Sequence, residues 1–443
     1  MSKGKDLVRN FCANLPNKPG IYKFFGQDKK ILYIGKAKDL KKRVSYYYKD
    51  DLPTRLQRMV FEVEVAEYIL TKSEAEAFLL EASQIRANKP KYNILLKDDK
   101  SFPFIKVTSD DEYPALMKYR GKKLRDEKLY GPFASIADVE RTLAIIKKIF
   151  KLRTCSDAYF SNRKRPCLQY QIKKCSAPCT GKITREEYRE SVDQAILFLS
   201  GKSSALQKTL SEKMEQYSEN MNFEKAAEIR DNIKALSYVQ VRSGVVSSDM
   251  KDADVIICIS KSGILCIEVF FYRASQFYGS APYFPKAIDG SEDAEILSSF
   301  IGQFYQTRTP PARIITNLKL EDKDSIEQGL YELYKTKTKI IFSSQDNDEV
   351  MSHAILNANE SLAKKITQSS KNLEVLERMK EIFKLDDMPT RIEAYDNSHI
   401  MGKYAVGAFI VAGIDGFEKS EYIKYTIQSN INYFGGDVYA MLK

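Results

Sequence analysis

The chain has 443 residues, with 70 Lys and Arg against 59 Asp and Glu, which gives a formal net charge of +11. Its length predicts about three domains, and a hydrophobic fraction of 43% supplies apolar side chains for packed cores. No uncharged apolar run reaches the roughly 18 residues of a membrane span, and no signal sequence is recognisable. Because the seven cysteines are odd in number and no export signal precedes them, we expect a cytoplasmic protein without structural disulfides.

The surplus of positive charge is suited to binding a polyanion such as nucleic acid. Taken alone, however, such a net charge more commonly belongs to a basic protein that is merely soluble. Only two histidines are present, so zinc sites built from several histidines are almost excluded. Tyrosine is abundant at 27 residues. Any chemistry that needs a base is therefore expected from Tyr, Asp or Glu.

Residues 14–95 are predicted to form one compact α/β unit. Two short strand-like runs, at 20–25 and 30–34, flank a glycine-led turn, which is typical of a β-hairpin. Basic residues then indicate a helix at 36–48, and an apolar face indicates another at 74–88.

Three segments of different character follow. Residues 96–150 carry a strand-like run and a basic helix, and residues 151–200 contain four of the seven cysteines. Apolar residues then recur every three or four positions, pause at Met221–Phe223 and resume. This spacing predicts a hairpin of two amphipathic helices at 203–238.

Strand-like and helical stretches alternate again over residues 245–443. The strand-like runs lie at 255–260, 265–272, 314–315, 339–342, 391–396, 405–412 and 422–427, and the helices at 293–306 and 373–383. The chain is therefore expected to be a multidomain α/β (α+β) protein.

Two tripeptides, Gly20-Ile21-Tyr22 and Tyr33-Ile34-Gly35, lie in the first unit with ten residues between them. Alone they are weak evidence, but five further residues follow at matching positions: Lys36, Arg43, Tyr47, Glu81 and Asn93. Together these motifs resemble a GIY-YIG nuclease domain.

Hydrolysis of a phosphodiester bond suits these residue types. A carboxylate at Glu81 can hold one divalent cation, magnesium or manganese, which neutralises the scissile phosphate. Tyr33 would act as general base on the attacking water, and since a free tyrosine has a pKa of about 10, Lys36 is expected to stabilise its phenolate. Arg43 fits as a clamp on the developing negative charge.

The resemblance further implies that Tyr22 and Tyr47 order water and phosphate, and that Asn93 braces the site. The alternative is that the tyrosines pack on a strand face and the cations form a solvated helix face. That alternative is reasonable for any one residue but poor for all of them at matching positions.

Four cysteines, Cys155, Cys167, Cys175 and Cys179, lie within 25 residues. Four thiolates can ligate a zinc ion or an iron–sulfur cluster. The whole string resembles the cysteine-rich segment of the UvrC family, the nuclease subunit of bacterial nucleotide excision repair, in which this segment is associated with an iron–sulfur cluster. We therefore favour the cluster, with zinc as the alternative, and take the other cysteines to be ordinary thiols.

The predicted helical hairpin has a sequence of its own, Met221 to Asp231, that resembles the UVR motif through which UvrC binds UvrB. Phe223 at the turn is the expected anchor, because a large apolar ring flanked by charges is typical of an interface hot spot. The alternative, which the hairpin alone would favour, is a local coiled-coil spacer.

Residues 391–412 resemble the start of the RNase H-like nuclease domain of UvrC, where Asp396 corresponds to the first metal-binding aspartate. Two-metal hydrolysis needs several converging carboxylates. Val438 stands where the family has an aspartate, and Asp437 is one position away, about 100° around a helix. The later ligands and the helix–hairpin–helix motifs of the family are missing from the sequence. We therefore expect an incomplete second nuclease in a C-terminally truncated chain.

The resemblance as a whole implies a UvrC-type excinuclease subunit acting on double-stranded DNA. It would join a complex of UvrA, UvrB and damaged DNA, cut on the 3′ side of the lesion through the GIY-YIG site, and lack the 5′ cut. Two alternatives remain: a short UvrC homologue that makes only the 3′ incision, and a non-catalytic UvrB-binding or decaying UvrC fragment.

Overall fold

The structure, a computed structural model, has two compact units, residues 1–359 and 360–443. The described residues are 3–49, 51–96, 102–108, 112–121, 128–201, 203–242, 250, 252–274, 276–285, 292–343, 349–400, 403–414, 416–418 and 421–426. Over these residues no helix combines the length and the apolar character that crossing a membrane requires. The multidomain α/β fold predicted from the sequence is confirmed.

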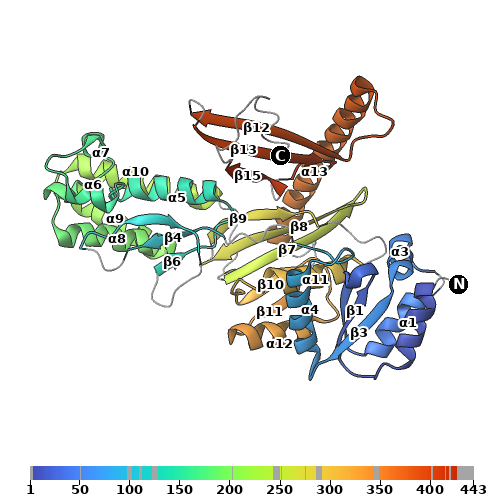
Figure 1. Cartoon of the computed structure of the whole chain (residues 1–443). Coiled ribbons are helices and arrows are strands. Elements are labelled where there is room, and N and C mark those ends of the chain that lie inside the picture. Colours follow the sequence, from blue (N-terminus) through green and yellow to red (C-terminus); the bar gives the residue numbers. More distant parts are fainter. Residues whose placement is uncertain are drawn as a thin grey trace. The chain divides into compact units, whose positions relative to one another are not determined.

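The N-terminal region is built on a three-stranded antiparallel sheet with the strand order β2-β1-β3 (Figure 1). Its elements are α1 (Lys3–Ala13), β1 (Gly20–Phe25), η1 (Gln27–Lys29), β2 (Ile31–Ala37), α2 (Leu40–Val44), η2 (Ser45–Tyr48), α3 (Thr54–Glu62), β3 (Val65–Leu70) and α4 (Glu74–Asn88). The register places Tyr22 opposite Gly35 and Phe24 opposite Tyr33. The two motif tripeptides therefore lie side by side on neighbouring strands.

The structure differs from the expected elements of this region at several places, and helices α1 and α3 have no counterpart among them. The basic stretch does not become helical at residue 36, because β2 continues to Ala37 and the side chain of Asp39 caps the helix by accepting from the Lys42 amide. Strand β3 has no counterpart among the expected elements. Most of its side chains are exposed, so the alternation of apolar and polar residues that marks a half-buried strand is missing.

Residues 104–199 form a small antiparallel sheet, in the order β5-β4-β6, followed by helices. Its elements are β4 (Phe104–Val107), β5 (Leu116–Tyr119), β6 (Lys128–Tyr130), α5 (Ile136–Ile149), α6 (Asp157–Ser161), α7 (Leu168–Gln171), η3 (Pro178–Thr180) and α8 (Arg185–Leu199). The phenol of Tyr188 donates to the Pro114 carbonyl at 3.0 Å and accepts from the Arg153 amide at 3.1 Å. This buried tyrosine joins α8 to the connection between β4 and β5 and to the segment that follows α5.

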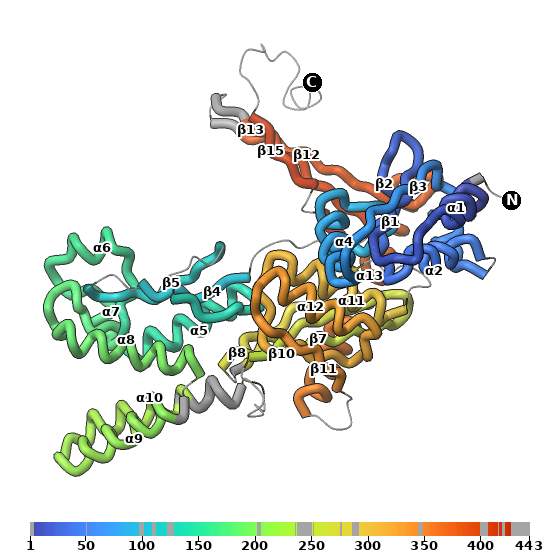
Figure 2. The backbone as a smooth tube through the Cα atoms, turned by 90° about the horizontal axis from the view of Figure 1, so that it is seen from below, coloured from blue at the N-terminus to red at the C-terminus, as the bar shows by residue number. Residues whose placement is uncertain are grey.

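Two long helices, α9 (Ser203–Glu219) and α10 (Phe223–Arg242), form an antiparallel hairpin, whose helices run side by side in Figure 2. Leu206, Leu210 and Leu236 are buried toward the base of the hairpin, and nearer the turn the ammonium of Lys151 pairs with Glu228 at 2.5 Å. The base is therefore fixed to the preceding helices, whereas the turn is exposed.

Residues 252–342 form a mixed five-stranded sheet in the order β11-β10-β7-β8-β9. Its elements are β7 (Asp252–Lys261), β8 (Ile264–Arg273), β9 (Gln276–Tyr283), α11 (Asp293–Phe304), β10 (Arg313–Thr316), α12 (Lys323–Tyr334) and β11 (Lys339–Phe342). Asp254 on β7 is 1% exposed, pairs with Arg273 at 2.7 Å and accepts a hydrogen bond from Tyr305 at 2.6 Å. This network fixes the end of α11 to the sheet.

Helices α11 and α12 both pack on α4, the helix that closes the N-terminal region. The contact needs glycine on both sides of Phe78, because a Cβ at Gly302 or Gly329 would lie 2.9 or 3.1 Å from its ring. The amide of Gln303 also donates to the Ile94 carbonyl at 2.9 Å. One face of α4 thus contacts β1 and β2, and another contacts α11 and α12.

The second unit contains most of a 35-residue helix and an antiparallel sheet. The elements are α13 (Glu349–Phe383), which begins in the first unit, β12 (Arg391–Ile400), β13 (Lys403–Gly413), β14 (Gly416–Phe417) and β15 (Ile423–Thr426). The helix was expected only at 373–383. The strands β12 and β13 are longer than the runs seen in the sequence by a few residues, and β15 is shorter.

Candidate active site

The seven residues of the GIY-YIG pattern converge at one cavity of about 920 Å³. They come from β1, β2, α2, η2, α4 and the segment that follows α4. Five of them line the cavity: Tyr33, Lys36, Arg43, Glu81 and Asn93. Tyr22 and Tyr47 are buried in the core beside it.

Three tyrosines form a compact cluster in the site. The hydroxyls of Tyr22 and Tyr47 are hydrogen-bonded at 2.7 Å, and the ring of Tyr33 lies 6.1 and 6.0 Å from theirs, centroid to centroid. Burial raises the pKa of all three phenols, and the guanidinium of Arg43 offsets part of that rise. The phenols are therefore protonated at neutral pH unless a further positive charge approaches them.

The carboxylate of Glu81 is held at the end of β2. Glu81 is 7% exposed, and its Oε1 accepts a hydrogen bond from the Lys36 amide at 2.9 Å. Burial raises the pKa of Glu81, against the lowering effect of Lys36. Since only one carboxylate oxygen receives this amide, the other can serve a cation.

Asn93 braces the same edge of this strand, two residues before Lys36. Its side-chain amide donates to the Ile34 carbonyl at 2.7 Å, and its carbonyl accepts from the Ile34 amide at 2.8 Å. These two bonds tie the segment after α4 to β2, so that Tyr33 and Lys36 are held on a fixed strand.

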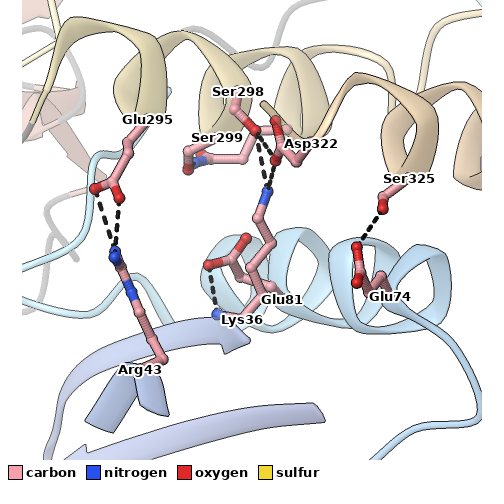
Figure 3. A network of polar contacts seen from close by, with 10 residues as sticks. Lys36, Arg43, Glu74, Glu81, Glu295, Ser298, Ser299, Asp322 and Ser325 are labelled. Carbon is pink, nitrogen blue, oxygen red and sulfur yellow. Dashed lines mark hydrogen bonds and ion pairs between the residues drawn. The ribbon is translucent and has the colours of Figure 1, made fainter. Parts of the chain in front are cut away.

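Both cations of the site are paired with carboxylates from the 252–342 region (Figure 3). The ammonium of Lys36 lies 2.6 Å from Asp322 Oδ2 and 3.0 Å from Ser298 Oγ, and the guanidinium of Arg43 lies 2.9 Å from Glu295. Burial by itself would raise the pKa of Asp322, but Lys36 and Ser298 hold it below its usual value.

This pairing changes the expected geometry around Tyr33. The Lys36 ammonium points to Asp322 and lies 4.7 Å from the centre of the Phe78 ring, and Arg43 is the cation that lowers the Tyr33 pKa. Neither Glu295 nor Asp322 belongs to a motif, so sequence reasoning missed both. A short motif cannot reveal a contact between residues more than 250 positions apart.

The four cysteines of the second pattern share one neighbourhood. Cys175 is buried and the other three are half-buried. Burial raises the pKa of Cys175 and Cys179, and the charges of the other thiols of the set raise both further. Among the residues that the structure describes, however, no three His, Cys, Asp or Glu side chains are grouped closely enough to hold a metal ion.

The remaining predicted residues lie elsewhere. The ring of Phe223, the first residue of α10, is 65% exposed, and Met221 beside it is 79% exposed. Asp396 is exposed on β12, opposite Ala408. Residues 436–439, which were expected to carry the next part of the second nuclease, lie outside the described residues.

Five family models match the chain in the expected order. They are the UvrC-like GIY-YIG domain (18–94), the middle domain of the UvrC/Cho excinuclease (102–198), the UvrB/UvrC motif (204–239), the UvrC ribonuclease H-like domain (252–365) and the UvrC RNase H endonuclease domain (380–443). The chain therefore carries matches to two RNase H-like models.

Curated relatives and a solved domain are similar to the chain. The UvrABC system proteins C of Rickettsia bellii and Rickettsia felis are each 48% identical to it, over 98% and 96% of this chain and 68% and 66% of their own length. The chain thus spans about two thirds of these relatives. The GIY-YIG endonuclease domain of UvrC from Thermotoga maritima, solved with magnesium, is 34% identical over 21% of this chain and 99% of that chain, with a TM-score of 0.19. On the family models and the curated relatives, the chain belongs to the UvrC family of excinuclease subunits.

Proposed function

We propose that the chain cuts damaged duplex DNA on the 3′ side of the lesion, through the GIY-YIG site and in complex with UvrB. The observation that carries this proposal is the convergence of Tyr33, Arg43 and Glu81 at one cavity from three separate elements. Packing residues of unrelated purpose have no reason to bring a buried carboxylate, an arginine and three phenols to one place.

One divalent cation fits at Glu81. Magnesium keeps several water ligands and takes one or two carboxylates together with phosphate oxygens, so a single buried carboxylate is a suitable donor set. A bound cation would neutralise the scissile phosphate and polarise its oxygen. Arg43 would hold a phosphate oxygen, and Tyr33 would take the proton of the attacking water. The hydrogen-bonded phenols of Tyr22 and Tyr47 would orient that water.

The first prediction concerns the Glu81→Gln variant, which keeps the shape of the side chain but removes its charge. Because the cation loses its carboxylate, we expect 3′ incision to fall by at least about a hundredfold. Binding of DNA and of UvrB should remain. The assay uses a duplex with one bulky lesion, labelled at each end in separate reactions, with UvrA, UvrB, ATP and magnesium.

Glu67→Gln is the matched control, since Glu67 is exposed on β3 and is not among the residues that line the cavity. It should cut like the unchanged chain. A 3′ product that survives in Glu81→Gln at the normal rate would show that Glu81 is not the metal ligand.

The same assay addresses the second nuclease. We propose that the 5′ cut is lost, on the ground that Val438 replaces an expected carboxylate and that two-metal hydrolysis needs several of them. Asp396 on β12 is a single carboxylate, and a two-metal site needs several. A 5′ product made by this chain would contradict the proposal.

The ion pairs at the site have a consequence for DNA binding. Asp322 and Glu295 occupy the Lys36 and Arg43 groups that would otherwise contact phosphates. A bound DNA strand must therefore compete with these carboxylates. Both pairs are partly exposed to solvent, so the competition is expected to be modest.

The second prediction follows for the double variant Asp322→Asn and Glu295→Gln. Freed of both carboxylates, the site should bind duplex DNA about three- to tenfold more tightly at low salt, measured by fluorescence anisotropy without divalent cation. The control, Glu374→Gln with Asp386→Asn, removes two exposed carboxylates of the second unit. Equal gains in both variants would mean that only the net charge matters.

We further propose that the α9–α10 hairpin binds UvrB. The exposed side chains at its turn support this role, as does the buried base that holds the hairpin in place. Lys225 lies 5.2 Å from the centre of the Tyr217 ring, so the turn presents apolar and charged groups together. Such a mixture is typical of an anchor residue with a polar rim.

The third prediction is that Phe223→Ala weakens binding to UvrB by about 30-fold or more, because a central aromatic anchor contributes about 2 kcal/mol or more. Isothermal titration calorimetry with purified UvrB measures the change. The control is Phe61→Ala, since Phe61 is 71% exposed on α3. An unchanged affinity in Phe223→Ala would remove this residue from the interface.

The four cysteines, whose thiols share one neighbourhood, are proposed to hold an iron–sulfur cluster, with zinc as the alternative. Thiolates are the ligands that both groups prefer. The shared environment of the four thiols supports one common group. We also propose that the protein works in the reducing cytoplasm, where thiols persist.

The fourth prediction is that protein purified without oxygen contains iron and absorbs visible light, and that Cys175→Ser loses both. Elemental analysis distinguishes iron from zinc. Cys12→Ser is the control, because Cys12 lies outside the set of four and its thiol donates to the Lys41 carbonyl, which a serine hydroxyl can also do. Metal content that is the same in Cys175→Ser and in the unchanged chain would contradict a site at these cysteines.

A further inference from the structure

Residues 158–185, which include α7 and the loops around it, contain seven Lys and Arg and no Asp or Glu. Acidic residues resume at Glu186, in the first turn of α8. Six of these cations make up what we call the basic surface: Arg163, Lys164, Arg165, Lys173, Lys174 and Lys182. The motifs assigned above give these side chains no role.

The basic surface is exposed and has no counter-charge. Each of its six side chains is exposed, and none forms an ion pair with any carboxylate that the structure describes. Neighbouring cations do pair: Lys151 with Glu228 and Lys213 with Glu190. The six cations therefore differ from these neighbours, whose charges are neutralised by carboxylates.

The backbone that carries the surface is held in place. The amides of Lys173 and Lys174 donate to the Tyr170 and Gln169 carbonyls at 2.9 and 2.8 Å. The Ser176 amide donates to the Lys151 carbonyl at 2.9 Å, which fixes the loop to the end of α5. Because the backbone is already ordered, little conformational entropy of the loop would be lost when a ligand binds.

We propose that the basic surface binds the phosphate backbone of duplex DNA, as a contact separate from the GIY-YIG site. Lysine is depleted in protein–protein interfaces, whereas Lys and Arg supply the phosphate contacts of DNA-binding proteins. Six unpaired cations are therefore better suited to a polyanion than to another folded protein. The exposed Leu168 and Ile172 lie between them in sequence and Tyr159 precedes them, and these three are too few to form an apolar interface core.

The inference rests on the proposed function in naming DNA as the polyanion. Phosphate contacts carry no sequence information, so the surface would position the chain on any duplex. Specificity for damage would remain with the partner proteins.

The fifth prediction is tested with the triple variant Lys164→Gln, Lys173→Gln and Lys174→Gln in the full chain. Binding of a fluorescent undamaged duplex is measured by anisotropy over a series of NaCl concentrations, without divalent cation. Each lost phosphate contact lowers the slope of log K against log salt by about 0.9. We expect a slope smaller by about 2 to 3 and an affinity at least about tenfold weaker at low salt.

The control triple is Lys319→Gln, Lys335→Gln and Lys337→Gln, which removes the same charge from exposed positions around α12. It should keep the slope within about half a unit. Equal losses in both triples, or no loss in the first, would overturn the proposal. Loss of UvrB binding with unchanged DNA binding would overturn it in favour of an acidic protein partner.

Two further measurements keep the result interpretable. The thermal unfolding midpoint and the metal content of the first triple should match those of the unchanged chain, since its substitutions are all at exposed positions. The Glu81→Gln chain should retain the full salt slope. If that chain still cuts DNA, the proposed active site fails, while the slope of the triple variant still decides the role of the basic surface.

Discussion

Helix α4 is the element on which the site depends, because it packs on a sheet and on two helices at once. On one side it contacts β1 and β2 and brings Glu81 under the Lys36 amide. On the other side Phe78 fills the space that Gly302 and Gly329 leave in α11 and α12. A shift of this helix would therefore move the Glu81 carboxylate and the carboxylates that pair with Lys36 and Arg43 together.

Burial then decides the electrostatics of the cavity. It raises the pKa of the three phenols and of Glu81, so the site favours neutral forms of these groups until positive charge arrives. A divalent cation at Glu81 would supply that charge, and a phosphate would then replace Asp322 and Glu295 as the partner of Lys36 and Arg43. Metal and substrate would thus convert a charge-balanced cavity into a reactive one.

Positive charge is used in two ways along the chain. In the cavity Lys36 and Arg43 each have a carboxylate partner, which lowers the cost of holding them near a hydrophobic core. On the basic surface near the four cysteines the cations have none among the described residues. A phosphate must displace a carboxylate before it can bind Lys36 or Arg43, whereas it can bind the cations of the basic surface directly. The two groups therefore suit different steps of contact with DNA.

The sequence alone determined the residues of the GIY-YIG pattern, the helical hairpin and the α/β class, because motifs and apolar periodicity depend on residues that are close in sequence. It also located α4 and both motif strands closely. It did not reveal β3, whose exposed side chains lack alternation, or most of α13. Only the tertiary structure brought Asp322 and Glu295 to Lys36 and Arg43. The physical reason is that an ion pair between distant segments depends on how helices pack, and packing is decided by the whole core.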